Sequence, residues 1–256
     1  MPIEQLNGAD LYYESHGEGP AVVFLHGAGG NHISWWQQVP SFSQSYRCIT
    51  IDHRGFGRST DPDGSGSESY AADLEALLDH LDIASAALVA QSMGGRTASQ
   101  FALAHPDRVW ALVMSDTLGI LSWADLTERR AVAREKNLAA AAEAGTLLRG
   151  YMAQSFITGN PEMTFLYGQA QALNPPRGET VPSDPLSHEQ IAALAPPTLF
   201  IVGSEDPVVG PEFVREVRAV IEGSEMEEFP GAGHSVYWEQ PDKYNPVLAA
   251  FLAKHA

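Results

Sequence analysis

The stretch LVAQSMGG at residues 88–95 places Ser92 between a short apolar run and a helical pattern. A serine at such a sharp turn requires a strained backbone, and only small residues two positions before and after it let the strand and helix cross. Ala90 and Gly94 meet that steric requirement. The stretch therefore predicts a strand, a turn and a helix that present Ser92 as a nucleophile, although serine also favours the start of any helix.

Apolar runs and helical patterns alternate outward from this stretch. The runs are rich in Val, Ile and Leu and too short for helices, which is typical of parallel strands buried on both faces. Such runs predict strands at residues 21–25, 47–51, 86–90, 109–114 and 198–202, and residues 225–229 are a further strand candidate. Helices are predicted at residues 70–81, 92–104 and 211–221. Asn7 and Gly8 favour a hairpin turn ahead of them. This alternation predicts an α/β sheet.

Residues 119–194 interrupt the alternation, because they contain helical patterns and several prolines but no convincing strand. We interpret this segment as a helical insertion. The predicted core domain comprises residues 1–118 and 195–256. Apolar and aromatic side chains in the insertion are suited to cover a pocket and exclude water, or simply to pack between helices.

The charge of the chain excludes several classes of partner. Its 256 residues carry 15 Lys and Arg against 32 Asp and Glu, a formal net charge of −17. Such a field repels phosphate backbones and anionic lipid headgroups, so we expect neither nucleic acid nor a membrane as partner. The oligomeric state stays open, a homodimer included.

Cysteine usage and the first residues of the chain bear on its location. Cys48 is the only cysteine, which excludes an internal disulfide framework and a cysteine-based zinc site. Met1–Gln5 shows no signal-peptide pattern, and no apolar run approaches the roughly 20 residues of a membrane span. We expect a cytoplasmic protein.

Two further residues complete a predicted catalytic triad with Ser92. Serine needs a histidine base and a carboxylate that orients the histidine. Asp206 follows the predicted strand 198–202, and His234 lies in a glycine-rich loop after the last predicted strand. The order Ser, Asp, His along the chain fits this interpretation. Asp116, just beyond the predicted strand 109–114, is the alternative acid, or else a helix cap or loop anchor.

An acyl-transfer site also needs donors for the developing oxyanion. The backbone N–H of Met93, directly after the nucleophile, is one candidate. The second lies in the glycine-rich segment 26–30, with the N–H of Ala28 as the expected donor. We therefore predict an oxyanion hole formed by these two groups.

Together these motifs resemble the α/β-hydrolase fold superfamily over essentially the whole chain. The resemblance rests on His26-Gly27, DHRGFGRS at residues 52–59, Ser92, Asp206-Pro207 and Gly233-His234. It implies an eight-stranded, mostly parallel sheet flanked by helices, with a helical cap inserted after the sixth strand. It also implies similarity to esterases, lactonases, enol-lactone hydrolases, cofactor-free haloperoxidases and carbon–carbon bond hydrolases. Relatives that open epoxides or remove halide use an aspartate nucleophile, so Ser92 disfavours those chemistries.

Other interpretations of the same residues are weaker. The glycines after the first parallel strand imitate a dinucleotide-binding turn, but His32 occupies the position of the third glycine. His26 and His32 lack further ligands at matching spacing, so we expect no metal and no cofactor. Arg54 is interpreted as a structural cation rather than a substrate ligand.

The expected function is a cofactor-independent serine hydrolase that cleaves a small carboxylic ester or lactone through an acyl-enzyme. Two alternatives remain open at this point. One is a carbon–carbon bond hydrolase of a dienone acid, which the lack of an obvious basic cluster disfavours. The other is a ligand-binding signalling protein that keeps the triad but turns over slowly. The fold alone does not decide between them.

Overall fold

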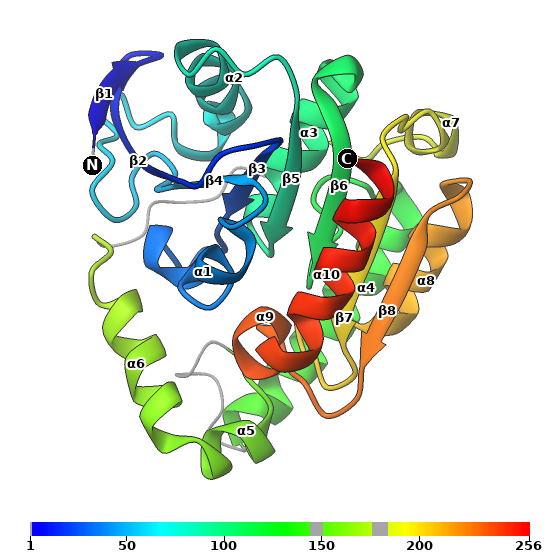
Figure 1. The fold of residues 1–256 in the computed structure, drawn as a ribbon. Helices are drawn as coiled ribbons and strands as arrows, with labels where there is room; N and C mark the ends of the chain where they lie inside the picture. Colours follow the sequence, from blue (N-terminus) through cyan, green and yellow to red (C-terminus); the bar gives the residue numbers. More distant parts are fainter. Residues whose placement is uncertain (1, 144–150, 176–183) are drawn as a thin grey trace.

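The computed structural model describes residues 2–143, 151–175 and 184–256, and an eight-stranded sheet forms the centre of these residues (Figure 1). The strands are β1 (Ile3–Leu6), β2 (Ala9–His16), β3 (Ala21–Leu25), β4 (Arg47–Ile51), β5 (Ala86–Gln91), β6 (Val109–Ser115), β7 (Thr198–Gly203) and β8 (Glu225–Phe229). They lie in the order β1-β2-β4-β3-β5-β6-β7-β8. β1, β2 and β4 pair antiparallel, whereas β4, β3, β5, β6, β7 and β8 pair parallel. This arrangement confirms the predicted fold class.

Helices cover both faces of the sheet, as Figure 1 shows. One face packs against α2 (Tyr70–His80), α3 (Gly94–Ala104) and α8 (Pro211–Val220), and the other against α1 (Val39–Phe42), α9 (Val236–Glu239) and α10 (Pro241–His255). Three short 3₁₀ helices lie in the connections: η1 (His32–Trp35), η2 (Gly66–Glu68) and η3 (Pro106–Arg108). Alternate residues of one strand serve opposite faces, since Val23 packs toward α2 and α3 while Phe24 packs toward α1. Burial on both faces explains the nearly continuous apolar runs in the sequence.

The helices differ from the sequence prediction at their ends and by one additional helix. α2 and α8 each end one residue earlier than predicted, at His80 and Val220. α3 begins at Gly94, two residues after the predicted start, because Ser92 adopts a left-handed backbone that a helix does not accommodate. α10 has no counterpart among the predicted helices, since it contains Pro241 and Pro246. Pro241 is the first helical residue, where no N–H is needed, and buried side chains at helical spacing stabilise the rest against Pro246. Those buried side chains are Tyr244, Leu248, Phe251 and Leu252.

The regular structure described between β6 and β7 consists of helices joined by irregular loops. It holds α4 (Ala124–Glu143), α5 (Gln154–Gly159), α6 (Pro161–Gln171) and α7 (His188–Ala192). Residues 144–150 and 176–183 of the predicted insertion lie outside the described residues. α5 and α6 lie beyond the carboxyl ends of the parallel strands, whereas α7 contacts α8 (Figure 1). The division into a core and a cap domain stays a prediction.

The described residues of this segment add to the core of the sheet. Leu126 of α4 and Ile191 of α7 belong to the apolar cluster on the α3 face. Ile157 of α5 and Tyr167 of α6 belong to the cluster on the α10 face. The segment therefore reaches both sides of the sheet, where its apolar residues pack in the same clusters as side chains of the parallel strands.

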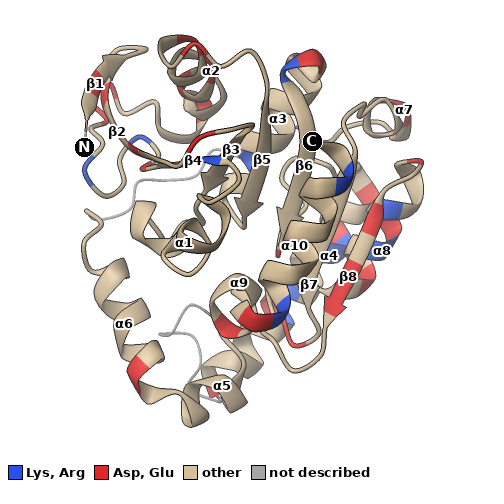
Figure 2. Ribbon diagram, in the orientation of Figure 1, with Lys and Arg blue, Asp and Glu red and all other residues tan. Residues whose placement is uncertain are grey.

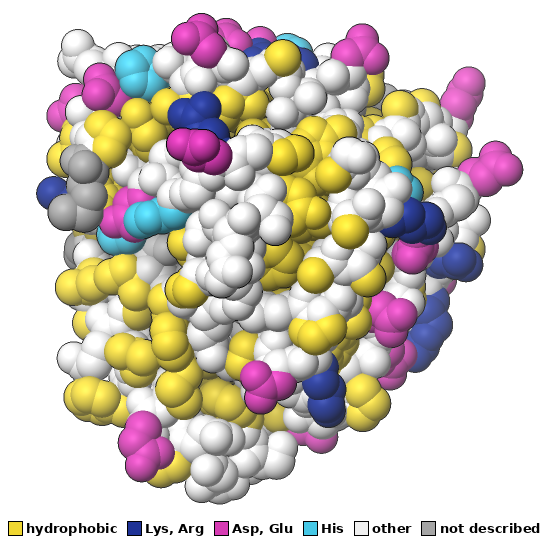
Figure 3. Space-filling model, viewed as in Figure 1, with side chains coloured by type: hydrophobic (Ala, Val, Ile, Leu, Met, Phe, Trp, Pro, Cys, Tyr) yellow, Lys and Arg dark blue, Asp and Glu magenta, His cyan; other side chains and the backbone are white. Residues whose placement is uncertain are grey.

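The chain carries an excess of acidic residues, and some of them form ion pairs at the surface. Several carboxylates on α8 and β8 form ion pairs with basic side chains, such as Glu216 with Arg129 and Glu228 with Arg215. Figure 2 shows acidic and basic positions close together on these two elements. Figure 3 shows hydrophobic side chains gathered over α6, where 68% of Phe165 is exposed. Within the described ranges, no helix combines the length and apolar character that a bilayer crossing requires.

Backbone segments pack closely around Gly203, at the end of β7 on the carboxyl edge of the sheet. A substitution at this position tests how much that close packing contributes to stability. A Cβ atom there would lie 2.1 Å from the carbonyl oxygen of Gly233 and 2.3 Å from that of Ala232. We expect Gly203→Ala to lower the free energy of unfolding by about 1–3 kcal/mol, because backbone must shift to accept the methyl group. Urea unfolding followed by circular dichroism measures the change.

Gly168→Ala is the matched control. Gly168 lies inside α6, and a Cβ atom there meets nothing within 4 Å. We expect this substitution to stabilise the protein slightly, by about 0.5–1 kcal/mol, because alanine favours a helix interior. Equal unfolding midpoints for the two variants would contradict the packing argument.

Candidate active site

Three predicted side chains meet at the carboxyl edge of the parallel strands. Ser92 follows β5, Asp206 follows β7 and His234 follows β8. The Nε2 atom of His234 lies 2.8 Å from Ser92 Oγ, and its Nδ1 atom lies 2.9 Å from Asp206 Oδ2. The structure thus brings the three residues into one chain of hydrogen bonds, which we call the Ser-His-Asp chain.

The backbone at Ser92 is strained, and this strain sets the position of its side chain. Its φ of +48° lies in the left-handed region, which is uncommon for a residue with a side chain. The next helix then passes close to β3, since a Cβ atom at Gly94 would lie 2.3 Å from the carbonyl oxygen of Leu25. The strained backbone expected at this serine is therefore present. Ser92 is held by its N–H, which donates to the carbonyl of Ser115 at 3.1 Å.

Asp206 is fixed by the loop that follows it. Its Oδ1 atom accepts from the N–H of Val208 at 2.7 Å and of Val209 at 3.2 Å. Its side chain is fully buried. Because Oδ1 is held by two backbone donors, Oδ2 is oriented toward His234 with little conformational freedom.

The imidazole of His234 is buried among carboxylates. Burial acts to lower its pKa, but the charge of Asp206 and the hydrogen bond to it outweigh that effect, and Asp116 and Glu239 act in the same direction. The pKa of His234 therefore lies above its ordinary value. With Nδ1–H donating to the carboxylate of Asp206, Nε2 is left as the acceptor for the Ser92 hydroxyl.

Asp116, the alternative acid, is occupied by backbone donors. One carboxylate oxygen accepts from the N–H of Gly203 at 3.0 Å and the other from the N–H of Val236 at 3.1 Å. Burial and the charge of Asp206 raise the pKa of Asp116 well above its ordinary value. Asp116 thus connects the ends of β6, β7 and the start of α9, while the hydrogen bond to Nδ1 of His234 comes from Asp206.

The segment predicted to supply an oxyanion donor packs directly against Ser92. A Cβ atom at Gly27 would lie 3.1 Å from the Cβ atom of Ser92. His26 anchors this loop, because its Nε2 accepts from the N–H of His53 at 3.0 Å and its Nδ1 lies 2.7 Å from the carbonyl oxygen of Gly27. Burial lowers the pKa of His26, so the neutral ring with Nδ1–H donating fits both contacts. The oxyanion roles of Ala28 and Met93 stay predictions.

Other residues weighed in the sequence have partners elsewhere. His32 donates its backbone N–H to Asp52 at 2.6 Å, and its Nδ1 lies 2.8 Å from the same oxygen. Arg54 is buried and binds both oxygens of Asp73, at 3.0 and 2.7 Å. Among the described residues, no group of three or more His, Cys, Asp or Glu side chains is arranged to hold a metal ion.

The sequence analysis missed the residues that fix the backbone of His234 and of its neighbours by hydrogen bonds. The side-chain amide of Gln91 donates to the carbonyl of His234 at 2.7 Å, and the N–H of His234 donates to the carbonyl of Tyr151 at 3.1 Å. Glu239 accepts hydrogen bonds from residues on both sides of His234. The available signals were a glutamine next to the nucleophile and an acidic residue one turn beyond the histidine.

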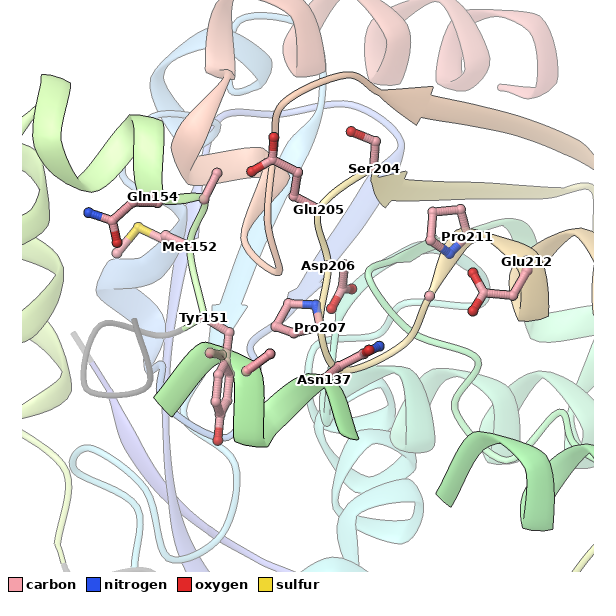
Figure 4. A pocket seen from close by; sticks show the side chains of 14 residues that line it. Asn137, Tyr151, Met152, Gln154, Ser204, Glu205, Asp206, Pro207, Pro211 and Glu212 are labelled. Carbon is pink, nitrogen blue, oxygen red and sulfur yellow. The ribbon is translucent and has the colours of Figure 1, made fainter. Parts of the chain in front are cut away.

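A cavity of about 440 Å³ borders Asp206 (Figure 4). Its wall comes from the carboxyl half of α4, the residues before α5 and the loop from β7 to α8. Figure 4 labels Asn137, Tyr151, Glu205 and Pro207 among the lining side chains. Ser92 is not among the described residues that line it. This cavity therefore adjoins the acid of the Ser-His-Asp chain rather than its nucleophile.

Comparison with known proteins identifies the family. Residues 20–144 match the family model of the alpha/beta hydrolase fold. The chain is 30% identical to a 2-hydroxy-6-oxononadienedioate/2-hydroxy-6-oxononatrienedioate hydrolase of Paraburkholderia xenovorans, over 95% of this chain and 90% of that protein. It is 29% identical to 3-oxoadipate enol-lactonase 2 of Acinetobacter baylyi, over 95% and 93% of the two chains.

Solved structures with a similar fold point to the same family as these relatives. A thermophilic esterase from Thermogutta terrifontis is 28% identical, superposes with a TM-score of 0.80, and is matched over 97% of this chain and 95% of the esterase. The order of strands, the strained serine after β5 and the full-length likeness to these proteins lead to one conclusion. The chain belongs to the alpha/beta hydrolase fold family.

Proposed function

We propose that this protein is a cofactor-independent serine hydrolase that cleaves a small carboxylic ester or lactone through an acyl-enzyme. The observation that carries the proposal is the Ser-His-Asp chain, with 2.8 Å between Ser92 and His234 and 2.9 Å between His234 and Asp206. Relatives named as an enol-lactonase and an esterase support the same class of substrate. The protein as a whole is a hydrolase of this family.

The acylation step follows from the tautomer of His234. Ser92 Oγ attacks the carbonyl carbon while its proton moves to Nε2 of His234, and Asp206 stabilises the imidazolium that forms. As the tetrahedral intermediate collapses, Nε2 gives that proton to the leaving alkoxide, and an alcohol departs. In a lactone the alcohol stays attached to the acyl group.

Deacylation repeats the same steps with water. His234 takes a proton from a water molecule, and the resulting hydroxide attacks the acyl carbon. Collapse of the second intermediate returns the proton to Ser92 Oγ and releases the acid. In both steps we assign the oxyanion to the N–H groups of Met93 and Ala28, which would contribute several kcal/mol of transition-state stabilisation.

We also propose that residues 119–194 act as a cap over this site. Contacts of α6 and of the residues just after it with the loop that holds Ala28 support this assignment. The side-chain amide of Asn31 donates to the carbonyl of Ala170 at 2.8 Å, and that of Asn174 donates to the carbonyl of Gly30 at 3.0 Å. A cap fastened to this loop would define the shape of the acyl pocket and exclude water from it.

The nucleophile is tested with Ser92→Ala on p-nitrophenyl esters of short acids. We expect wild-type protein to release p-nitrophenol with a burst and then steadily, and the variant to lose at least about a thousandfold in kcat. Ser155→Ala is the matched control, because Ser155 is exposed on α5. Wild-type turnover by Ser92→Ala would refute the mechanism. Labelling of Ser92 by a fluorophosphonate without ester turnover would favour the slow-turnover signalling alternative.

The raised pKa of His234 predicts the pH dependence. The imidazole must be neutral to accept the proton of Ser92, so kcat/KM should fall as the pH drops through the pKa of His234. We expect the midpoint above about 6.5, the ordinary value for histidine. In Asp206→Asn the midpoint should move to lower pH, because a negative charge next to the ring is lost. A profile that is flat from pH 5 to 9 would contradict the assignment of His234 as base.

One observation favours an acidic substrate and keeps the carbon–carbon hydrolase alternative open. Arg130 of α4 has a buried Nε atom without a hydrogen-bond partner, and no ion pair involves it within the described part of the chain. Burial lowers the pKa of Arg130, while the charge of Asp206 acts to raise it. A half-buried cation that interacts electrostatically with Asp206 is suited to bind a carboxylate of the substrate.

The role of Arg130 is tested by comparing kcat/KM for a negatively charged ester with kcat/KM for a neutral ester. We expect Arg130→Met to lower kcat/KM for mono-p-nitrophenyl succinate at least about tenfold, the usual effect of losing a charged hydrogen bond, with little change for p-nitrophenyl butyrate. Arg134→Met is the control, because Arg134 is exposed on the same helix. Equal losses on both esters would mean that Arg130 only supports the fold.

A further inference from the structure

Glu239 is a buried carboxylate outside the Ser-His-Asp chain. It is the last residue of the short helix α9 and is 7% exposed. Its Oε1 atom accepts from the N–H of Gly233 and of Ser235, each at 3.1 Å. Its Oε2 atom accepts from the N–H of Gly233 at 2.9 Å and of Ala153 at 3.0 Å. Three backbone donors therefore converge on one carboxylate.

These donors come from two segments that are far apart in sequence. Gly233 and Ser235 flank His234, whereas Ala153 immediately precedes α5. His234 adds a parallel contact, because its own N–H donates to the carbonyl of Tyr151 at 3.1 Å. The loop that carries the base is thus fastened to residues 151–153 through Glu239 and through main-chain contact.

The cost of this arrangement indicates a function beyond packing. Burying a carboxylate is unfavourable, and burial raises the pKa of Glu239 even though the three N–H donors act in the opposite direction. A helix of four residues does not need a buried charge at its end for its own stability. The donors on each side of His234 instead require an acceptor of fixed position, which a carboxylate supplies with two oxygens.

We propose that Glu239 is a positioning residue that fixes the backbone on both sides of His234 and so sets the distance between His234 Nε2 and Ser92 Oγ. This inference rests on the proposed function of His234 as the base. Loss of the carboxylate would leave the N–H groups of Gly233, Ser235 and Ala153 without their acceptor. The imidazole would then sample orientations in which Nε2 does not reach the serine.

Glu239 also contributes to the charge around the imidazole. Asp206 and Asp116 face the ring of His234 from the ends of β7 and β6, and the Tyr151 ring lies 6.1 Å from it. Tyr167 of α6 approaches from the cap side, where its hydroxyl lies 3.3 Å from Ser235 Oγ. Of these groups, Asp206, Asp116 and Glu239 favour the protonated ring. Removing the charge of Glu239 therefore shifts the pKa of His234 downward.

The test compares Glu239→Gln with Glu239→Asp. Active sites are first counted with a fluorophosphonate, so that kcat refers to labelled protein only. We expect Glu239→Gln to lower kcat at least tenfold with KM changed less than threefold, and to move the acidic limb of kcat/KM to lower pH. Glu239→Asp should also lower kcat, because its carboxylate is one methylene shorter, but it should keep the acidic limb in place.

Glu227→Gln is the matched control. Glu227 is an exposed carboxylate of β8, away from the Ser-His-Asp chain, and its side chain makes no hydrogen bond or ion pair among the described residues. Its loss should leave both kcat and the acidic limb unchanged, since exposed charges are screened by solvent. A Glu239→Gln variant with wild-type kcat per labelled site and an unmoved acidic limb would overturn the proposal.

Failure of the proposed function is a separate outcome. If wild-type protein hydrolyses no ester, the rate at which a fluorophosphonate labels Ser92 still reports on the base, because that reaction needs only an activated serine. Slower labelling of Glu239→Gln, with its pH midpoint lowered, would support the positioning role without ester turnover. If Glu239→Gln does not fold, as judged by circular dichroism, the decision falls to Glu239→Asp, for which labelling at the wild-type rate would overturn the proposal.

Discussion

The left-handed backbone of Ser92 is the constraint on which the site depends. A φ of +48° between β5 and α3 places the hydroxyl beyond the sheet edge, and every neighbour must leave room for that turn. The residues two positions before and after it, Ala90 and Gly94, are small, and a Cβ atom at Gly94 would lie only 2.3 Å from the carbonyl oxygen of Leu25 in β3. The strain is maintained because the two elements are buried in the apolar core and cannot separate to relieve it.

Electrostatics around His234 depend on the same close packing. Asp206, Asp116 and Glu239 are all buried near one imidazole, and each accepts hydrogen bonds from backbone N–H groups. Backbone donors have fixed positions, so they hold the negative charges near the ring without a flexible counter-ion. The raised pKa of His234 is a consequence of how the ends of β6, β7 and α9 are packed.

Most of the fold followed from periodicity in the sequence. Most of the parallel strands were readable because burial on both faces leaves uninterrupted runs such as residues 21–25. Ser92 and Asp206 were readable because each follows such a run, and His234 because it lies in a glycine-rich loop after the last strand. Glu239 was not readable, since its role depends on Ala153, a residue 86 positions away. Helix α10 was missed because its prolines act against local propensity, and only buried side chains compensate.

The order of the site residues along the chain has a consequence for synthesis. Ser92 precedes His234 by 142 residues, and the strained turn lies in the first half of the protein. At about 5–20 residues per second, a ribosome needs roughly 7–28 s to add that stretch. During this interval a nascent chain carries Ser92 without His234. Under the proposed mechanism, Ser92 therefore gains its activating partner only after β8 and the loop beyond it have been made.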